Sequence, residues 1–263
     1  MHGILLDSLF VVIQVICVTS IAVFATTIYL HRGLAHRSLE IISEGFERFL
    51  YRAILITTGI DRRYWVAIHR KHHTFTETEK DPHSPFIYGF WKIQLFNVVY
   101  YIRAAKTHGI VERFAPDIPL RWGDSPALRG FRGLALGIAA LILVGVAFSL
   151  VRGNSIRYGV FLGLLVAAIH AFLYVFVLSP SINGLCHWTG VKRFPDIPAY
   201  NIRLLGWLVG GEGLHNNHHK YPPSPKFSIF KGDLDPSWQV VKFLAEINLI
   251  LITGKIGTPE PAA

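Results

Sequence analysis

The sequence predicts an all-α integral membrane protein, with about three transmembrane helices, interfacial amphipathic helices and a histidine-rich helical cap. The 263-residue chain is 51% hydrophobic and only 16% charged, which leaves too little polar surface to cover a soluble fold. Three apolar runs are long enough to cross a bilayer. The 13 histidines are many for so apolar a chain, and most of them lie outside these runs.

The first apolar run, residues 4–30, would extend about 40 Å as a helix, which is enough to cross the hydrocarbon core. No Lys or Arg precedes it and no cleavage site follows a short apolar region, so it is expected to be a retained span rather than a signal peptide. Two further runs, residues 133–151 and 158–178, flank a short turn and predict an antiparallel helical hairpin. Together they predict a single membrane domain over residues 1–263.

The distribution of basic residues predicts the orientation in the membrane. Lys and Arg are absent from the first thirty residues and gather in residues 31–132 and 179–263, so the positive-inside rule makes these regions cytoplasmic. The two arginines of the hairpin turn oppose this orientation but are outnumbered. The net charge of +9 suits an anionic membrane surface or an acidic protein partner, and nucleic acid is not expected for a chain this apolar.

Two moderately apolar stretches, residues 42–60 and 90–105, lie between the first and second spans. The first carries several charges, each of which costs about 2.5–3.5 kcal/mol at the bilayer centre. Both stretches are therefore expected to be amphipathic helices at the membrane interface. The alternative is that they simply pack beneath the cytoplasmic region.

The pattern H-x-x-H-H occurs twice, at residues 69–73 and 215–219. Positions i, i+3 and i+4 share one face of a helix, so each copy can direct three imidazoles to one place. A further pair, His31 and His36, lies where the first apolar run ends. Its spacing is less regular for an α-helix, and Gly33 between the two is expected to loosen the turn.

A fourth segment adds Asn183 and His187, which are four residues apart and follow the third apolar run. Four segments therefore direct nine histidines to the same predicted cytoplasmic face, which chance packing does not explain. Imidazole binds iron, zinc and copper, and nine nitrogens exceed the coordination of one tetrahedral metal. The sequence thus predicts two metal ions held by histidine.

The other four histidines are expected to have ordinary structural roles. We expect His2, His108 and His170 to be hydrogen-bonded core residues, with an intramembrane polar site as the alternative for His170. His83, in the run Asp81-Pro82-His83, is expected to shape its loop or to form a hydrogen bond.

The segments HRGLAH at residues 31–36, HRKHHTFTETEKDPH at residues 69–83 and GEGLHNNHH at residues 211–219 resemble the three histidine boxes of membrane fatty acid desaturases. They are most similar to the acyl-CoA delta-9 type and its bacterial acyl-lipid relatives, over residues 29–231. In that family nine histidines hold a di-iron centre and an asparagine acts through a water. The resemblance implies these iron-binding residues: His31, His36, His69, His72, His73, His187, His215, His218, His219 and, through water, Asn183.

The same resemblance implies an enzyme that uses O2 and two Fe ions to insert a cis double bond, of the delta-9 type, into a long saturated acyl chain on a phospholipid or acyl-CoA. The chain has no dinucleotide-binding motif and no cysteine cluster, so a separate electron donor is expected: a ferredoxin, a rubredoxin or a cytochrome with its reductase. The animal and yeast enzymes have two crossings before the first box, whereas this chain has room for one. We therefore expect a bacterial inner-membrane enzyme whose histidine boxes face the cytoplasm.

Three carboxylates lie within the family-like motifs, at Glu77, Asp81 and Glu212. They are expected to orient the imidazoles by accepting a hydrogen bond from the ring nitrogen that does not bind metal. The alternative is that they belong to solvated loops or helix caps.

Two other functions are compatible with the histidines. A di-iron membrane hydroxylase of fatty acids, sterols or alkanes shares the same boxes, but the contexts Asp81-Pro82-His83 and Gly211-Glu212-Gly213 favour a desaturase. A histidine-rich transporter or sensor for zinc or copper is the alternative from another class. The spans hold few polar residues besides His170, which disfavours transport.

Overall fold

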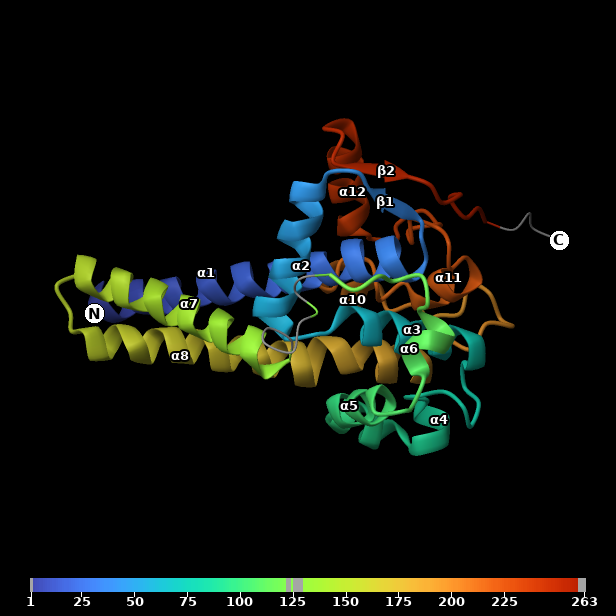
Figure 1. Ribbon diagram of the computed structural model, residues 1–263, viewed down its shortest axis with the longest axis horizontal. Helices are drawn as coiled ribbons and strands as arrows, with labels where there is room; N and C mark the ends of the chain where they lie inside the picture. The colour runs from blue at the N-terminus through green and yellow to red at the C-terminus, as the bar shows by residue number, and fades with distance from the viewer. Residues whose placement is uncertain (1, 122–123, 125–129, 260–263) are drawn as a thin grey trace.

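The computed structural model describes residues 2–121, 124 and 130–259, which form a long helical rod with a compact cap at one end (Figure 1). The described elements are, in chain order, α1 (His2–Ala25), η1 (Thr26–Ala35), β1 (Leu39–Ile41), α2 (Glu44–Thr58), α3 (Arg62–Phe75), α4 (Pro85–Tyr88), α5 (Phe90–Ala105), α6 (Ile110–Phe114), α7 (Phe131–Val151), α8 (Ile156–Phe172), η3 (Leu173–Leu178), η4 (Ser181–Leu185), α9 (Cys186–Trp188), α10 (Arg203–Leu208), α11 (His215–Lys220), α12 (Pro236–Glu246) and β2 (Ile250–Ile252). Apart from one short antiparallel strand pair, β1–β2, the regular structure of the described residues is helical, which confirms the predicted all-α class.

Three helices are long and apolar enough to span a membrane: Gly3–Ala35, Phe131–Val151 and Ile156–Trp188. This confirms the number of predicted spans. Two of them are longer than predicted, because π-helical segments continue the helix where hydrophobicity falls. A 33-residue helix extends about 50 Å, well beyond a hydrocarbon core of about 30 Å. The first and third spans therefore reach into the cap, where they carry predicted metal ligands.

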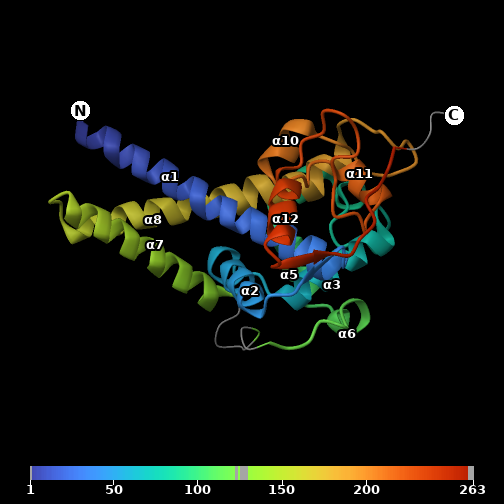
Figure 2. The ribbon, with the colours of Figure 1, turned by 90° about the horizontal axis from the view of Figure 1, so that it is seen from above.

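The beginning of α1 lies beside the turn between α7 and α8, at the end of the rod away from the cap (Figures 1 and 2). Asp7 joins these segments, because its carboxylate pairs with Arg152 and accepts a hydrogen bond from Tyr158 Oη at 2.9 Å. One of the two turn arginines that oppose the predicted orientation is thus already neutralised by an acidic partner.

Helices α7 and α8 pack against each other through glycines. A Cβ atom on Gly145, Gly159 or Gly163 would collide with the backbone of the opposite helix. Gly137 makes an equally close approach to the backbone of Ile56 on α2. Small residues allow this contact between helices in a membrane, where hydrophobic burial provides little driving force.

The amphipathic helices α2 and α5 combine the two roles considered from the sequence. On α2, Leu50 and Ile54 are buried against the first span, whereas Phe49 is 58% exposed. On α5, Ile93 is buried and Trp91 is 70% exposed. One face of each helix packs on the protein, and the other presents apolar side chains suited to the membrane interface.

The chain after the third span returns to cover the first histidine segment. Strand β2 pairs with β1 in the register Leu39↔Ile252, directly after His36. Helix α12 buries Val241 and Leu244 against Ile28 of η1. These contacts fix the end of the first span inside the cap.

We expect Gly159→Leu to destabilise the protein by about 1–3 kcal/mol or more, because the larger side chain cannot fit against α7. The measurement is the thermal unfolding temperature of the purified protein in detergent. Ala140→Leu, on an exposed position of α7, is the matched control and is expected to change this temperature little. Equal shifts for the two variants would show that the glycine contact does not determine the packing of the hairpin.

Candidate metal centre

Nine imidazoles from four segments meet inside the cap, and they are the nine histidines predicted from the sequence. They divide into one group of five and one group of four, and in each group the ligand nitrogens lie within 4.8 Å of one another. The first group consists of His31, His36, His69, His73 and His218. The second group consists of His72, His187, His215 and His219.

The π-helical turn of η1 explains how the first histidine pair converges. Residues five apart in an α-helix point about 140° away from each other. In the wider π turn, the His36 amide donates to the His31 carbonyl at 3.0 Å, an i+5 bond that brings the two rings together. Their ring centroids lie 4.8 Å apart. Gly33 fits this turn, since a Cβ there would lie 3.1 Å from the Ile28 carbonyl oxygen.

The Nε2 atoms of the histidines point toward one another. The separation is 3.0 Å between His31 and His218, 3.0 Å between His73 and His218, and 2.8 Å between His36 and His69. In the group of four, His215 Nε2 lies 3.0 Å from His187 Nε2 and 3.1 Å from His219 Nε2. The two groups are therefore clusters of inward-facing nitrogens.

The opposite ring nitrogens of three histidines contact the three predicted carboxylates. His31 Nδ1 lies 2.7 Å from Glu212, and His72 Nδ1 lies 3.0 Å from Asp81. His187 Nδ1 lies 2.8 Å from Glu77 Oε1. A carboxylate at Nδ1 favours the tautomer with the proton on that nitrogen, which leaves the Nε2 lone pair directed into the cluster.

The electrostatics of the site favour neutral imidazoles. Burial, followed by the neighbouring imidazoles, lowers the pKa of several histidines well below its usual value: His69, His73, His215, His218 and His219. Burial alone would raise the pKa values of Asp81 and Glu212, but contact with His72 and His31 outweighs it and lowers both. These five imidazoles are thus neutral, and Asp81 and Glu212 are anions.

His187 and His215 each have Nδ1 beside an oxygen acceptor, so their Nε2 lone pairs face each other at 3.0 Å, which is unfavourable unless a proton or a cation lies between them. Because burial disfavours protonation, a metal cation is the partner that suits these clusters. The donor set therefore fits two metal ions with imidazole ligands.

Asn183 contacts another asparagine, and its predicted role through a water stays a prediction. Its Nδ2 donates to Asn97 Oδ1 at 3.0 Å. His83 stacks on His72 with 4.5 Å between ring centroids, and its backbone amide donates to Asp81. Burial lowers the pKa of His83 to about 3, so it is a neutral packing partner that shapes its loop.

The prediction that the remaining histidines are hydrogen-bonded core residues is confirmed for one of them and wrong for another. His170 is buried, with ring nitrogens 3.0 Å from Thr19 Oγ1 and 2.8 Å from the Thr57 carbonyl oxygen, as predicted for a hydrogen-bonded core residue. The prediction for His108 is wrong, because this residue is exposed in the turn between α5 and α6. A polar turn keeps the imidazole hydrated without any buried partner. The side chain of His2 lies outside the described residues.

Two arginines that the sequence reasoning missed hold the centre together, and each directly follows the first histidine of a box. Arg32 is fully buried, pairs with Asp235 at 2.9 Å and lies 4.0 Å over the Phe227 ring. Arg70 donates to the carbonyl oxygens of Leu34 at 2.7 Å and Ala35 at 3.0 Å. Arg32 thus joins η1 to the C-terminal region, and Arg70 joins α3 to the end of η1. The repeated His-Arg pair is the signal that could have identified them.

An asparagine network, also missed, positions α11. Asn201 Oδ1 accepts from the backbone amides of Asn216 at 2.9 Å and Asn217 at 3.2 Å. The Asn216 side chain accepts from the amides of Arg193 and Phe194, both at 2.8 Å. The two asparagines within the third box are therefore structural, and they fix the helix that presents three of the histidines.

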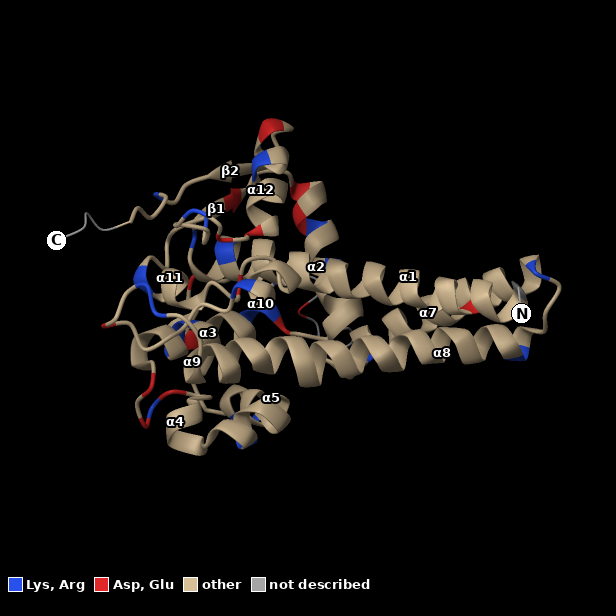
Figure 3. Cartoon of the chain, turned by 180° about the vertical axis from the view of Figure 1, so that it is seen from behind, with Lys and Arg blue, Asp and Glu red and all other residues tan. Residues whose placement is uncertain are grey.

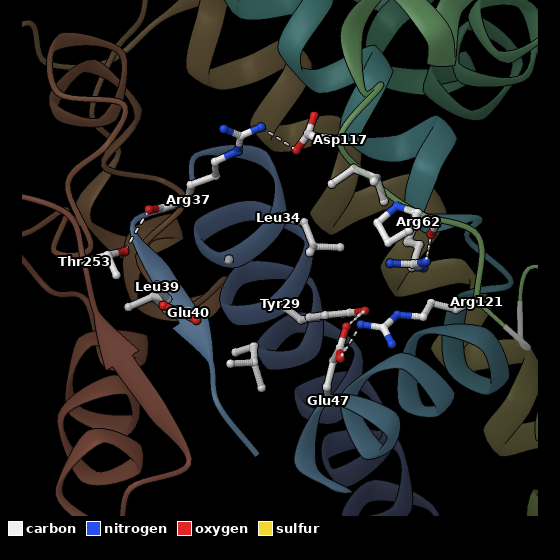
Figure 4. Close-up of a pocket in the computed structure, with 14 residues that line it drawn as sticks. Tyr29, Leu34, Arg37, Leu39, Glu40, Glu47, Arg62, Asp117, Arg121 and Thr253 are labelled. Atoms are coloured by element: carbon white, nitrogen blue, oxygen red, sulfur yellow. Dashed lines mark hydrogen bonds and ion pairs between the residues drawn. The ribbon is translucent and has the colours of Figure 1, made fainter. Parts of the chain in front are cut away.

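A cavity of about 420 Å³ lies beside η1, and its lining contains none of the nine histidines (Figure 4). Several of its lining side chains contact one another: Tyr29 Oη donates to Glu47 at 3.2 Å, Arg121 pairs with Glu47 at 3.1 Å, and Arg37 pairs with Asp117 at 2.6 Å. This space is therefore distinct from the two histidine clusters.

The sequence profile described as fatty acid desaturase matches residues 8–229 of the chain. The chain belongs to the fatty acid desaturase family. The delta-9 acyl-lipid desaturase 2 of Arabidopsis thaliana is 31% identical over 227 residues, which cover 85% of this chain and 68% of the relative. The acyl-CoA C20 Delta5-desaturase of Anemone leveillei is 31% identical over 86% of this chain and 68% of its own length. The sn-1 stearoyl-lipid 9-desaturase of Anabaena variabilis is 27% identical over 85% of this chain and 76% of its own length.

This desaturase is therefore an integral membrane enzyme of lipid metabolism that acts on fatty acyl substrates, as the histidine boxes predicted. Family membership favours an enzyme over a metal transporter or sensor. The chemistry of the family is metal-dependent, and the clustered imidazoles are the groups of the desaturase that could bind the metal.

We expect Glu212→Gln to weaken the affinity of the desaturase for ferrous iron by about 10–100-fold. Gln keeps the shape of the side chain but removes the negative charge that favours the Nδ1–H tautomer of His31. Competition with a chelator of known affinity measures the change. Glu246→Gln, at an exposed position of α12, is the control. Unchanged affinity in Glu212→Gln would contradict an orienting role for this carboxylate.

Proposed function

We propose that the chain is a di-iron, O2-dependent desaturase that introduces a cis double bond, of the delta-9 type, into a long saturated acyl chain carried by a phospholipid or acyl-CoA. Residues 1–263 act as one membrane desaturase domain. The observation that carries this proposal is the pair of clusters of inward-facing Nε2 atoms, five nitrogens in one and four in the other. Imidazole is a good ligand for iron, and two clusters suit two ions.

The balanced reaction takes two hydrogens from adjacent carbons, with O2, two electrons and two protons, and yields the alkene and two waters. The bound irons would serve to reduce O2 and would supply the oxidising power that this reaction needs. The nine histidines would hold the irons as neutral ligands. Glu77, Asp81 and Glu212 would keep each contacted ring in the tautomer that binds metal, and Asn183 would act through a water. Burial of the histidines would limit the access of bulk water to the reacting chain.

The proposed location is the inner membrane of a bacterium, with the cap in the cytoplasm. Basic residues are frequent on the cap and sparse along the spans, which supports this orientation through the positive-inside rule (Figure 3). Electrons would come from a separate ferredoxin, rubredoxin or cytochrome with its reductase. An acidic donor would be attracted to the basic cap.

We expect expression of the wild-type chain in a host that lacks the product to generate new monounsaturated fatty acids, and the purified protein to contain about two irons. Gas chromatography–mass spectrometry of total lipids detects the alkene, its position and the lipid class that carries it. Hydroxylated products without alkenes would contradict the desaturase and indicate a hydroxylase. Zinc or copper without O2-dependent turnover would indicate a metal-handling protein.

We expect His72→Ala and His218→Ala to abolish desaturation, because each removes a ligand from one of the two clusters. Membrane insertion should persist, since neither residue lies within a span. Membrane fractionation and lipid analysis measure the two properties on the same cells. His108→Ala, which replaces an exposed histidine, should retain full activity. Activity in either ligand variant would overturn the assignment of these histidines.

A further inference from the structure

We propose that Asn97, on the interfacial helix α5, is a positioning residue that fixes the orientation of the Asn183 amide relative to the metal centre. This inference rests on the proposed function, in which Asn183 acts on the irons through a water. It assigns to α5, which carries none of the nine histidines, a direct connection to the site.

Asn97 forms a short hydrogen-bonded chain with two residues that follow the third span. Its side chain is buried, at 7% exposure, although its neighbour Phe96 is 53% exposed on the same apolar helix. Asn97 Nδ2 donates to Ser179 Oγ at 3.1 Å, and Asn97 Oδ1 accepts from Asn183 Nδ2 at 3.0 Å. A buried amide on an apolar helix is costly unless it is hydrogen-bonded, and both ends of this amide are bonded.

The contact with Asn97 determines which way the Asn183 side-chain amide points. A primary amide has a donor end and an acceptor end, and its neighbours determine which way each one points. Because Asn97 Oδ1 accepts from Asn183 Nδ2, the nitrogen of the Asn183 amide is turned toward α5 and its Oδ1 is left for another partner. An oxygen acceptor is the end that suits a water bound to a cation. The reverse orientation would present N–H donors to that water's protons and to the cation.

The local backbone supports a fixed arrangement. Asn183 lies in the π-helical segment η4, four residues before the clustered His187. Gly184 allows α5 to approach this segment closely, since a Cβ there would lie 3.1 Å from Gln94 Oε1 and 3.5 Å from Ile93 Cγ2. The contact between α5 and η4 is therefore close enough to hold the side-chain amides of Asn97 and Asn183 in a fixed relative orientation.

The test compares four variants with the wild-type holoenzyme: Asn97→Leu, Asn97→Asp, Asn183→Ala and the double variant Asn97→Leu/Asn183→Ala. The readouts are iron per chain, the rate of iron release to the ferrous chelator ferrozine, the thermal unfolding temperature and the rate of desaturation. Ser181→Ala is the matched control, because Ser181 is buried in η4 and its Oγ donates within its own helix, to the Val177 carbonyl oxygen at 2.5 Å.

We expect Asn97→Leu to release one iron about tenfold faster or more, and to lower turnover by a similar factor. Asn97→Asp should stay within about threefold of wild type, since its carboxyl oxygens can accept both from Asn183 Nδ2 and from the Ser179 hydroxyl. The double variant should match Asn183→Ala alone, because residues that act through one contact are not additive. Ser181→Ala should match wild type in iron release.

Iron release from Asn97→Leu at the wild-type rate, or effects of Asn97→Leu and Asn183→Ala that multiply, would overturn the inference. If Asn97→Leu does not fold, Ser179→Ala decides instead, because it removes only the hydrogen bond that holds Asn97. It should accelerate iron release, and a wild-type rate would overturn the inference. A wild-type protein without iron or without alkene product would refute the proposed function itself. Normal wild-type activity with a silent Asn97→Leu would refute only the role of Asn97.

Discussion

The architecture of this desaturase depends on holding imidazole nitrogens about 3 Å apart in a buried space. Lone pairs that face one another repel, and burial disfavours relief by protonation. The apoprotein must therefore maintain this cluster through its other contacts. The Arg32–Asp235 pair, the Arg70 contacts to the end of η1 and the asparagine network at α11 all join segments that carry ligands. These contacts provide the rigidity that keeps the site formed.

The membrane helices are part of this framework as well as anchors. The first and third spans each continue through π-helical segments into the cap and end at clustered histidines. The second span carries no clustered histidine and packs on its neighbour through glycines. Two of the spans thus place clustered histidines, whereas the second completes the hairpin.

Composition and spacing were sufficient to predict the spans and the nine histidines, because hydrophobicity and ligand identity are local properties of the sequence. The contacts that bring these histidines together were harder to predict from the sequence. The spacing of His31 and His36 is irregular for an α-helix, and only the π turn brings these rings together. Arg32, Arg70 and Asn97 were missed because their partners are distant in the chain, at Asp235, Leu34 and Asn183. His108 was assigned to the core by residue type, but its turn is exposed.

The continuity of the long helices has a consequence for how such sequences can diverge. Deleting one residue from a continuous helix rotates everything beyond the deletion by about 100° and shifts it by about 1.5 Å. In the helices Gly3–Ala35 and Ile156–Trp188, that rotation would turn His31 and His187 away from the other clustered histidines. Adaptation to a thicker or thinner bilayer must therefore proceed by substitution or by nearly whole helical turns. The span between them, Phe131–Val151, carries none of the nine histidines.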